Sequence, residues 1–369
     1  MRLHACAALL MCVLPAGVAG ADKPYRIETV AGGLEHPWCV AFLPDGRMLV
    51  TERAGRLRVI EGGKLLPDAV AGLPPVFVRS QGGLFDVLPA RDFARSRVLY
   101  LSFAHGNREA NATRVVRARL DGHALKDVQV VFTARPTKGT AAHFGGRMAW
   151  LPDGTLLLTL GDGFQHREQA QTLDNHFGKL VRINAEGSVP RDNPFTGGKG
   201  ALPEIYSYGH RNPQGLVVDA AANRIWMHEH GPKGGDELNL IEPGRNYGWP
   251  AITYGVDYSG AQISPYTEMK GMEQPLIHWT PSVAPAGMAL YDGALFPAWR
   301  GDLFVTTLVE RSVRRVDLDG GKVAGQEILF TEIGERLRDV RVGPEGALYL
   351  LTDLPEGKVL RVSPAPPAS

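Results

Sequence analysis

Cysteine is scarce in this sequence, which has 369 residues and only three cysteines. Two of them, Cys6 and Cys12, lie in an N-terminal segment that we expect to be removed, so the mature chain keeps only Cys39. A single cysteine excludes an internal disulfide. The mature protein must therefore be stabilised by the packing of its core, alone or together with a bound ion.

The sequence also lacks an excess of charge and a run of basic residues. It has 40 Lys and Arg against 39 Asp and Glu. A neutral chain of this kind has no electrostatic footprint for nucleic acid and no polybasic surface for a membrane. We therefore expect no nucleic-acid partner.

No apolar run is long enough to span a membrane. Arg2 and His4 precede an apolar stretch, residues 5–18, which is interrupted by Pro15 and is shorter than the ~18–20 residues that a span needs. Small residues follow at positions 16–21, and this order is typical of a secretory signal peptide. We therefore expect residues 1–21 to be a signal peptide, residues 22–369 to form one domain, and the protein to be periplasmic or secreted.

Glycine and proline are abundant, with 44 and 27 residues, and 44% of the chain is hydrophobic. This composition excludes a wholly disordered chain and favours many short strands joined by turns. An apolar strand, a turn rich in Pro, Asp and Gly, and a second apolar strand recur six times, at residues 40–50, 86–101, 148–158, 215–226, 288–305 and 340–350. A repeat built only from strands predicts an all-β, six-bladed β-propeller.

A β-sandwich is the alternative fold, but it accounts poorly for six similar hairpins. Residues 25–30 are expected to supply a strand that closes the ring with the C-terminal strands. The longest irregular stretches are residues 167–195 and 228–272, and connections of this length in a compact domain are usually functional. We expect such long loops to be inserted at one end of the propeller.

Polar clusters lie beside the hairpins. His143, in residues 142–147, has a side chain whose ordinary pKa suits a general base, although such a segment can also be a simple turn. Residues 209–215 contain Arg211, whose planar guanidinium suits a carboxylate or an oxyanion, and Asn212, which adds a donor and an acceptor. The alternative for this second cluster is a turn held by a salt bridge.

A third cluster, residues 229–237 with residues 246–249, mixes carboxylates with backbone carbonyls in a loop rich in Gly and Pro. Hard oxygen ligands of this kind suit calcium better than zinc, although the spacing is not that of a helix-loop-helix calcium site. A solvated acidic loop is the alternative.

Further polar residues precede the second and the sixth hairpins. Gln81 lies before the second, and Arg336 and Arg338 before the sixth. The two arginines alternate along an expected strand, so they face one side and suggest a polyanionic ligand, unless they are solvated charges of an edge strand. Because connections of a propeller can converge on one end of its channel, the clusters together predict a cleft with a histidine base, several polar anchors and a calcium-like loop.

The motifs, taken in order, resemble the soluble PQQ-dependent aldose sugar dehydrogenases of the glucose/sorbosone dehydrogenase family. The resemblance covers nearly the whole mature chain, and the order of the motifs is more specific than any one of them. The motifs are Gln81-Gly82-Gly83-Leu84, His143-Phe144-Gly145-Gly146-Arg147, Gly209-His210-Arg211-Asn212-Pro213-Gln214-Gly215, Glu229-His230-Gly231-Pro232, Gly235-Asp236-Glu237, Asn246-Tyr247-Gly248-Trp249-Pro250 and Arg336-Leu337-Arg338-Asp339.

This resemblance implies a propeller that holds pyrroloquinoline quinone (PQQ) at one end and oxidises the C1 hydroxyl of aldose sugars to lactones. His143 would take the proton of that hydroxyl, a hydride would pass from C1 to the quinone, and Arg211 would stabilise charge developing on the cofactor oxygen. An external acceptor would then take the electrons. The residues implied to contact the cofactor are Gln81, Arg211, Asn212, Tyr258, Arg336 and Arg338.

The resemblance also implies calcium as a second cofactor. The backbone carbonyls of Gly231 and Pro232 match a motif that holds calcium against the quinone in soluble glucose dehydrogenases. Glu237 and the carbonyl of Tyr247 match a calcium site of the closer sugar dehydrogenase group.

The sequence departs from the family pattern at two positions. Ala142 stands where the glucose enzymes carry an acid that supports the base, and Val309 stands where family members tend to have a cofactor-binding lysine. Arg311 lies two residues beyond Val309 and is a candidate replacement for that lysine. Two other functions are open on the same fold: a propeller that binds a ligand without redox chemistry, and a calcium-dependent lactonase.

Overall fold

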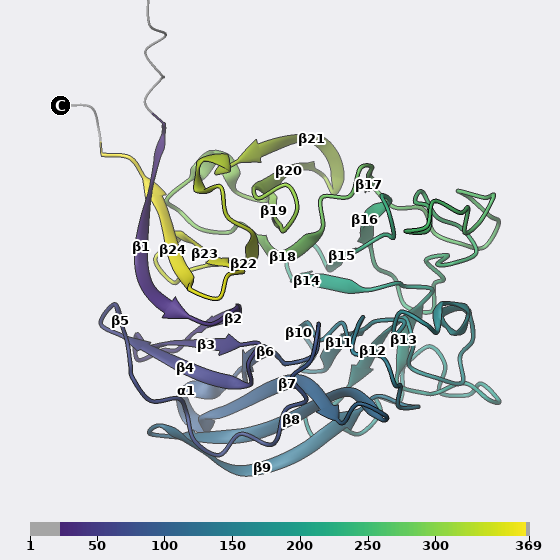
Figure 1. The fold of residues 1–369 in the computed structure, drawn as a ribbon, viewed down its shortest axis with the longest axis horizontal. Helices are drawn as coiled ribbons and strands as arrows, with labels where there is room; N and C mark the ends of the chain where they lie inside the picture. The colour runs from purple at the N-terminus through teal and green to yellow at the C-terminus, as the bar shows by residue number, and fades with distance from the viewer. Residues whose placement is uncertain (1–22, 367–369) are drawn as a thin grey trace, which may run out of the picture.

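A computed structural model of the chain describes residues 23–366, and the expected signal peptide, residues 1–21, lies outside the described residues. Six antiparallel sheets of four strands each surround a central axis (Figure 1). The prediction of a six-bladed β-propeller is therefore confirmed, and the alternative of a β-sandwich is wrong. No helix in residues 23–366 has the length and the apolar character that crossing a membrane requires.

The first strand of each blade is innermost, because these strands contact one another around the axis. The first three blades, from the inside outwards, are β2 (Pro37–Phe42), β3 (Met48–Glu52), β4 (Arg56–Glu61) and β5 (Lys64–Leu65); β6 (Leu84–Pro89), β7 (Val98–Gly106), β8 (Asn111–Asp121) and β9 (Ala124–Thr133); and β10 (Met148–Trp150), β11 (Leu156–Leu160), β12 (Lys179–Ile183) and β13 (Ile205–Tyr208).

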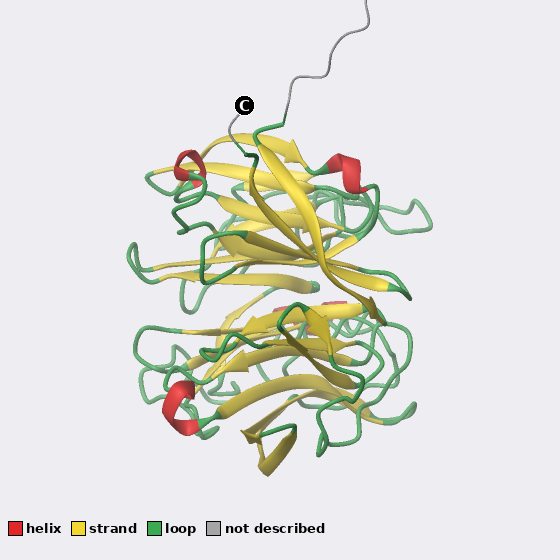
Figure 2. Ribbon diagram, turned by 90° about the vertical axis from the view of Figure 1, so that its left-hand side faces the viewer, coloured by secondary structure: helices red, strands yellow, loops and turns green. Residues whose placement is uncertain are grey.

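The next two blades are β14 (Pro213–Asp219), β15 (Arg224–Glu229), β16 (Asp236–Leu240) and β17 (Ile277–Trp279); and β18 (Pro285–Leu290), β19 (Leu303–Thr307), β20 (Val313–Asp319) and β21 (Lys322–Leu329). The sixth is β22 (Leu337–Val342), β23 (Leu348–Thr352), β24 (Gly357–Pro364) and β1 (Tyr25–Leu34). Helical segments are short and peripheral (Figure 2): α1 (Phe93–Ser96), η1 (Arg167–Gln171), η2 (Pro297–Trp299) and η3 (Thr331–Ile333).

The two ends of the described chain close the ring in a single blade. β1 pairs antiparallel with β24, in a register that runs from Tyr25 opposite Pro364 to Leu34 opposite Gly357 (Figure 1). The expected closing strand is therefore confirmed, and it extends four residues beyond Val30. Pairing the N-terminal strand with the C-terminal strands ties the last blade to the first along the sequence.

All six predicted hairpins are present as the first two strands of the blades. The turn glycines Gly46 and Gly154 have φ values of 88° and 86°, a conformation that residues with a Cβ rarely adopt. Open space surrounds both positions, so backbone conformation and not crowding requires glycine there.

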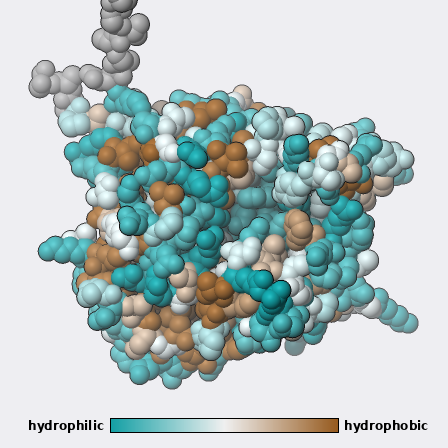
Figure 3. Space-filling view, in the orientation of Figure 1, coloured by the Kyte–Doolittle hydropathy of each residue, from teal (hydrophilic) through white to brown (hydrophobic). Residues whose placement is uncertain are grey.

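The hydrophobic core lies between neighbouring blades. One cluster joins Leu49 of β3 to Leu101 of β7, and another joins Phe304 of β19 to Leu350 of β23. Packing of adjacent sheets thus replaces the disulfide that the sequence excludes. On the face seen in Figure 3, apolar groups are scattered among hydrophilic ones.

Two stretches that were expected to be irregular each contain a strand. β12 lies within residues 167–195 and β16 within residues 228–272. Both strands carry charged residues, such as Lys179 and Glu237, that mask the apolar pattern, and pairing with neighbouring strands overrides this local signal. In residues 23–366 the longest connection without a strand or helix is residues 241–276, between β16 and β17.

Candidate active site

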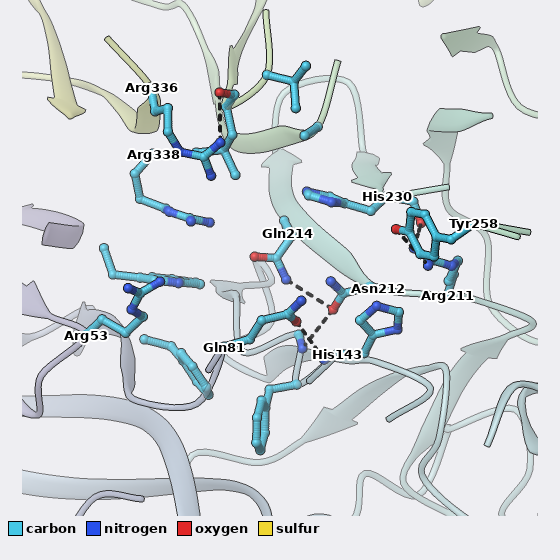
Figure 4. Close-up of a pocket in the computed structure, with 17 residues that line it drawn as sticks. Arg53, Gln81, His143, Arg211, Asn212, Gln214, His230, Tyr258, Arg336 and Arg338 are labelled. Atoms are coloured by element: carbon cyan, nitrogen blue, oxygen red, sulfur yellow. Dashed lines mark hydrogen bonds between the residues drawn. The ribbon is translucent and has the colours of Figure 1, made fainter. Parts of the chain in front are cut away.

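A cavity of about 240 Å³ lies where segments that precede the innermost strands meet. It brings together all seven of the residues predicted for the catalytic and cofactor sites, which come from four blades and the 241–276 loop (Figure 4). The predicted convergence at one end is therefore confirmed. The lining residues are Trp38, Arg53, Gln81, Phe85, His143, Phe144, Gly145, Arg211, Asn212, Gln214, His230, Tyr258, Ala284, Leu308, Val309, Arg336 and Arg338.

His143 is held rigidly at the wall of this cavity. The whole residue is 4% exposed, and its φ of 50° is uncommon for a residue other than glycine. The backbone N–H donates to Oε1 of Gln81 over 2.8 Å, and ring atom Nδ1 lies 2.6 Å from Oδ1 of Asp162. The first contact fixes the backbone of His143, and the second fixes the direction of its ring.

Asp162 supplies the carboxylate that Ala142 does not. It follows β11 in the segment Gly161-Asp162-Gly163, and its Oδ2 accepts the indole N–H of Trp249 over 2.8 Å. Its Oδ1 also accepts the backbone N–H of Phe164 over 2.7 Å. Sequence reasoning missed Asp162, although an acid between two glycines directly after a strand was a usable signal.

The charges around His143 determine its protonation. Burial opposes ionisation of Asp162, but the hydrogen bond and charge of His143 and the charge of Arg211 outweigh it and lower the pKa of that carboxyl. Burial, with the charges of Arg211 and Lys138, lowers the pKa of His143 although Asp162 raises it. His143 is therefore neutral near pH 7, Nδ1–H donates to the Asp162 carboxylate, and Nε2 is left as a base.

Arg211 lies on the same side of the cavity as His143 and is 4% exposed. Its Nη1 donates to the carbonyls of Gly231 over 2.6 Å and His230 over 3.1 Å, and its Nη2 lies 3.4 Å from the hydroxyl of Tyr258. These contacts fix a permanent positive charge beside the base.

Arg336 and Arg338 line the opposite side, as Figure 4 shows, and share one buried carboxylate. Oδ2 of Asp353 lies 2.7 Å from Nη2 of Arg338 and 3.5 Å from Nη2 of Arg336, while its Oδ1 lies 3.1 Å from Nδ1 of His36. Nε of Arg338 is buried without a hydrogen-bond partner in the described part of the chain. Asp353, which the sequence reasoning missed, therefore positions this pair.

Val309 lies at the cavity wall and is 61% exposed. Arg311 points elsewhere: its Nη1 lies 3.4 Å from the carbonyl of Gly334, and it is not among the residues that line the cavity. The structure therefore gives no support to Arg311 as the candidate replacement for that lysine. Arg53, which the sequence reasoning overlooked, does line the cavity.

An adjoining cavity of about 250 Å³ shares His143, Arg211 and Tyr258 with the first. Phe164 adds an aromatic wall, with its ring centroid 5.1 Å from that of His143 and in a T-shaped arrangement. The rings of Phe164 and Tyr258 are stacked at 6.5 Å, and both are exposed. His143 is therefore flanked by an open aromatic surface.

The expected calcium ligands fall into two separate places. Gly231 and Pro232 border cavities at the mouth, where Arg211 already donates to the carbonyl of Gly231. Glu237 and Tyr247 line neither of the two cavities described above. Among the described residues there is no group of three or more His, Cys, Asp or Glu side chains that could hold a metal.

Glu237 on β16 lies opposite Glu229 on β15. Burial, followed by the charge of Glu229, raises the pKa of Glu237 to about 8, so this carboxylate lacks a compensating positive charge. Tyr247 is buried and stacks on His210, which in turn contacts Glu229 over 3.1 Å. A cation bound here would need carbonyl oxygens and water besides these carboxylates, and that is a ligand set that calcium accepts.

Comparisons with known proteins agree with this geometry. The sequence pattern of the family described as "Glucose / Sorbosone dehydrogenase" matches residues 34–361. The aldose sugar dehydrogenase YliI of Escherichia coli is 43% identical over 361 residues, which cover 96% of this chain and 97% of that protein.

Two solved structures have the same fold. A crystal structure of a glucose dehydrogenase matches with a TM-score of 0.90 and 48% identity, over 92% of this chain and 100% of the other. The PQQ-bound form of an aldose sugar dehydrogenase from Streptomyces coelicolor matches with a TM-score of 0.75 and 28% identity, over 92% of this chain and 98% of the other. Since the family match extends over nearly all of the propeller, the chain belongs to the glucose/sorbosone dehydrogenase family.

Proposed function

We propose that this protein is a PQQ-dependent aldose dehydrogenase that oxidises the C1 hydroxyl of aldose sugars to lactones. The observation that carries this proposal is a buried, neutral His143, held by Asp162, beside a cavity lined by guanidinium groups. The names of the similar proteins, an aldose sugar dehydrogenase and a glucose dehydrogenase, support the same substrate class.

The charges of the cavity fit PQQ, which carries three carboxyl groups. Arg53, Arg336 and Arg338 line one side, where Asp353 is the carboxylate that contacts the last two. This leaves positive charge, and the unpartnered Nε of Arg338, for an anionic ligand. When bound, the quinone supplies an acceptor for the two electrons that leave C1 as a hydride. The residues proposed to hold it are Gln81, Arg211, Asn212, Tyr258, Arg336 and Arg338.

His143 acts as the general base. Its Nε2 takes the proton of the C1 hydroxyl, so that the oxygen can form the lactone carbonyl as the hydride leaves the carbon. The imidazolium that results is stabilised by the carboxylate of Asp162, 2.6 Å from Nδ1. A positioned base of this kind contributes about 10²–10⁴ in rate.

Arg211 and the aromatic wall complete the site. The guanidinium of Arg211 is fixed by two backbone carbonyls and places positive charge where negative charge develops during the reaction. Phe164 and Tyr258 present exposed rings beside His143, which give an aldose an apolar surface to lie against.

Calcium is proposed as a second cofactor. Glu237, with the carbonyl of Tyr247, would hold an ion whose positive charge would offset the facing carboxyl groups of Glu237 and Glu229. The carbonyls of Gly231 and Pro232 are proposed for a second ion at the mouth. The Gly231 oxygen has two lone pairs, so the hydrogen bond from Arg211 leaves one of them free.

Reconstitution tests the proposed function. Purified apoprotein is mixed with PQQ and calcium, then with glucose and a dye that accepts electrons. We expect dye reduction that requires both the quinone and the sugar. Binding of PQQ without dye reduction would favour a non-redox binding propeller, and release of acid from lactones without quinone would favour a calcium-dependent lactonase.

We further propose that the protein is exported, since the N-terminal segment has the pattern of a signal peptide. Mass spectrometry of protein recovered from the periplasm or the medium should give a mature N-terminus near residue 22. Recovery of the uncleaved chain in the cytoplasm alone would contradict this localisation.

A further inference from the structure

We propose that Arg53 is a carboxylate-binding residue of the cofactor site. This inference rests on the proposed function, because it names a further anchor for the same anionic cofactor.

Arg53 directly follows β3 and lines the cavity together with Arg336 and Arg338 (Figure 4). The other guanidinium groups of the cavity have protein acceptors: Arg338 contacts Asp353, and Arg211 contacts two backbone carbonyls. Within the part of the chain that the structure describes, the guanidinium of Arg53 makes no hydrogen bond and no ion pair of 4 Å or less. Its donors therefore remain available for a ligand.

The surroundings of Arg53 are unfavourable to its charge in the absence of an anion. Partial burial and the nearby charges of Arg338 and Arg336 lower its pKa, and Asp353 compensates only in part. Three guanidinium groups thus stand around the carboxylate of Asp353, and Glu35 adds a weaker negative charge near Arg53. An anion with several carboxylates would relieve that repulsion, and the planar fork of arginine matches a carboxylate with two parallel hydrogen bonds.

Gly83 explains how the side chain reaches this position. A Cβ built on Gly83 would lie 2.6 Å from Cγ of Arg53 and 2.2 Å from its carbonyl oxygen, so no other residue fits without movement. In the same short motif, Gln81 accepts the backbone N–H of His143. The Gln81–Leu84 segment therefore serves two parts of the site, one that holds the base and one that makes room for Arg53.

The cavity wall at Val309 offers no cation to an anionic ligand. Val309 contributes an exposed apolar side chain to the cavity wall. Arg311 donates to the carbonyl of Gly334 outside the cavity. Arg53 thus supplies a cation to the cavity from a different blade.

Binding measurements on the whole apoprotein test this inference. PQQ is titrated into wild type and Arg53→Met, and the quenching of tryptophan fluorescence is followed, since Trp38 lines the cavity. Methionine keeps the packing of the stem beside Gly83 but removes the charge. We expect Arg53→Met to bind PQQ about 10- to 100-fold more weakly, the range for loss of a charged hydrogen-bonded pair.

Two controls separate carboxylate recognition from other effects. Arg311→Met removes a nearby charge outside the cavity and should bind PQQ with wild-type affinity. The trimethyl ester of PQQ should bind wild type and Arg53→Met with nearly the same affinity, because it offers no carboxylate to the guanidinium. An equal loss for the acid and the ester would overturn the assigned role.

A rescue and a stability measurement complete the test. Val309→Lys, introduced into Arg53→Met, should raise the affinity for PQQ at least tenfold above that of Arg53→Met alone. Because the Arg53 guanidinium has no protein partner, Arg53→Met apoprotein should melt at the wild-type temperature or above it. A lower melting temperature with unchanged PQQ affinity would overturn the inference and indicate a structural role.

The outcomes distinguish this inference from the proposed function. If wild type does not bind PQQ, the proposed function fails, and this inference fails with it. If wild type and Arg53→Met bind PQQ equally, only the inference about Arg53 fails. Should Arg53→Met not fold, Arg53→Lys keeps the charge without the planar fork and should bind PQQ more weakly than wild type; equal binding would contradict the inference.

Discussion

Replacing Asp162 by asparagine tests how the base is held. Asp162 accepts hydrogen bonds from Nδ1 of His143 over 2.6 Å, from the indole of Trp249 over 2.8 Å and from the backbone of Phe164 over 2.7 Å. An asparagine keeps the shape but loses the charge, and its amide nitrogen would face donors. A hydrogen bond to a charged group is worth about 1.5–3 kcal/mol, so kcat should fall about 10- to 100-fold.

The pH profile of kcat gives a second readout for Asp162→Asn. Asp162 raises the pKa of His143, so its loss should lower that pKa further. Because His143 is proposed to act in its neutral form, activity should fall as the pH drops through its pKa. The acid limb should therefore move to lower pH in the variant while the plateau decreases.

The assay is dye reduction by the PQQ-loaded protein, with PQQ affinity measured in parallel to verify that the site is intact. Asp174→Asn, an exposed acid of the same loop, is the matched control and should change neither kcat nor the pH profile. Wild-type kcat together with an unmoved acid limb in Asp162→Asn would refute the assigned role of Asp162.

Two further predictions concern charge and stability. Burial opposes ionisation of Asp353, but the charge and hydrogen bond of Arg338 lower its pKa. The stabilisation that the ionised carboxylate gives to the folded protein is therefore complete above its unfolded pKa of about 3.9, and it is lost as the pH falls below that value. Asp353→Asn should lower the free energy of unfolding of the apoprotein by about 2–3 kcal/mol at pH 7 and by less below pH 4. Urea titration measures this, and equal effects at both pH values would contradict the prediction. Calcium at about 100 times its Kd should add about 2.7 kcal/mol to the free energy of unfolding of wild type, and a chelator should reverse this gain. Glu237→Gln should lose the part of this response that comes from the ion proposed at Glu237, and the exposed control Glu242→Gln should keep the full response, whereas a wild-type response in Glu237→Gln would contradict the site at Glu237.

Local patterns were enough to predict the propeller. The Asp-Gly turns at Gly46 and Gly154 mark hairpins because they demand a backbone conformation that few other residues adopt. The strands β12 and β16 escaped prediction because their charged residues interrupt the apolar alternation, and only pairing with neighbours makes them strands.

The site could be predicted in part. His143 and Arg211 stand in distinctive motifs, whereas Asp162 becomes the partner of His143 only when two segments 19 residues apart meet at the cavity. Arg53 lies at the end of an ordinary strand, and its unpaired charge is visible only once the ring has closed around it. The sequence identifies the chemical groups, while the fold determines which of them face each other.

The most direct test of this account compares PQQ-loaded wild type with PQQ-loaded His143→Ala in a single turnover with glucose, followed by the absorbance of the quinone. We predict that the two proteins bind PQQ with similar affinity and that the variant reduces it about 10²–10⁴ times more slowly. Reduction at the wild-type rate in His143→Ala would contradict the assignment of this imidazole as the base.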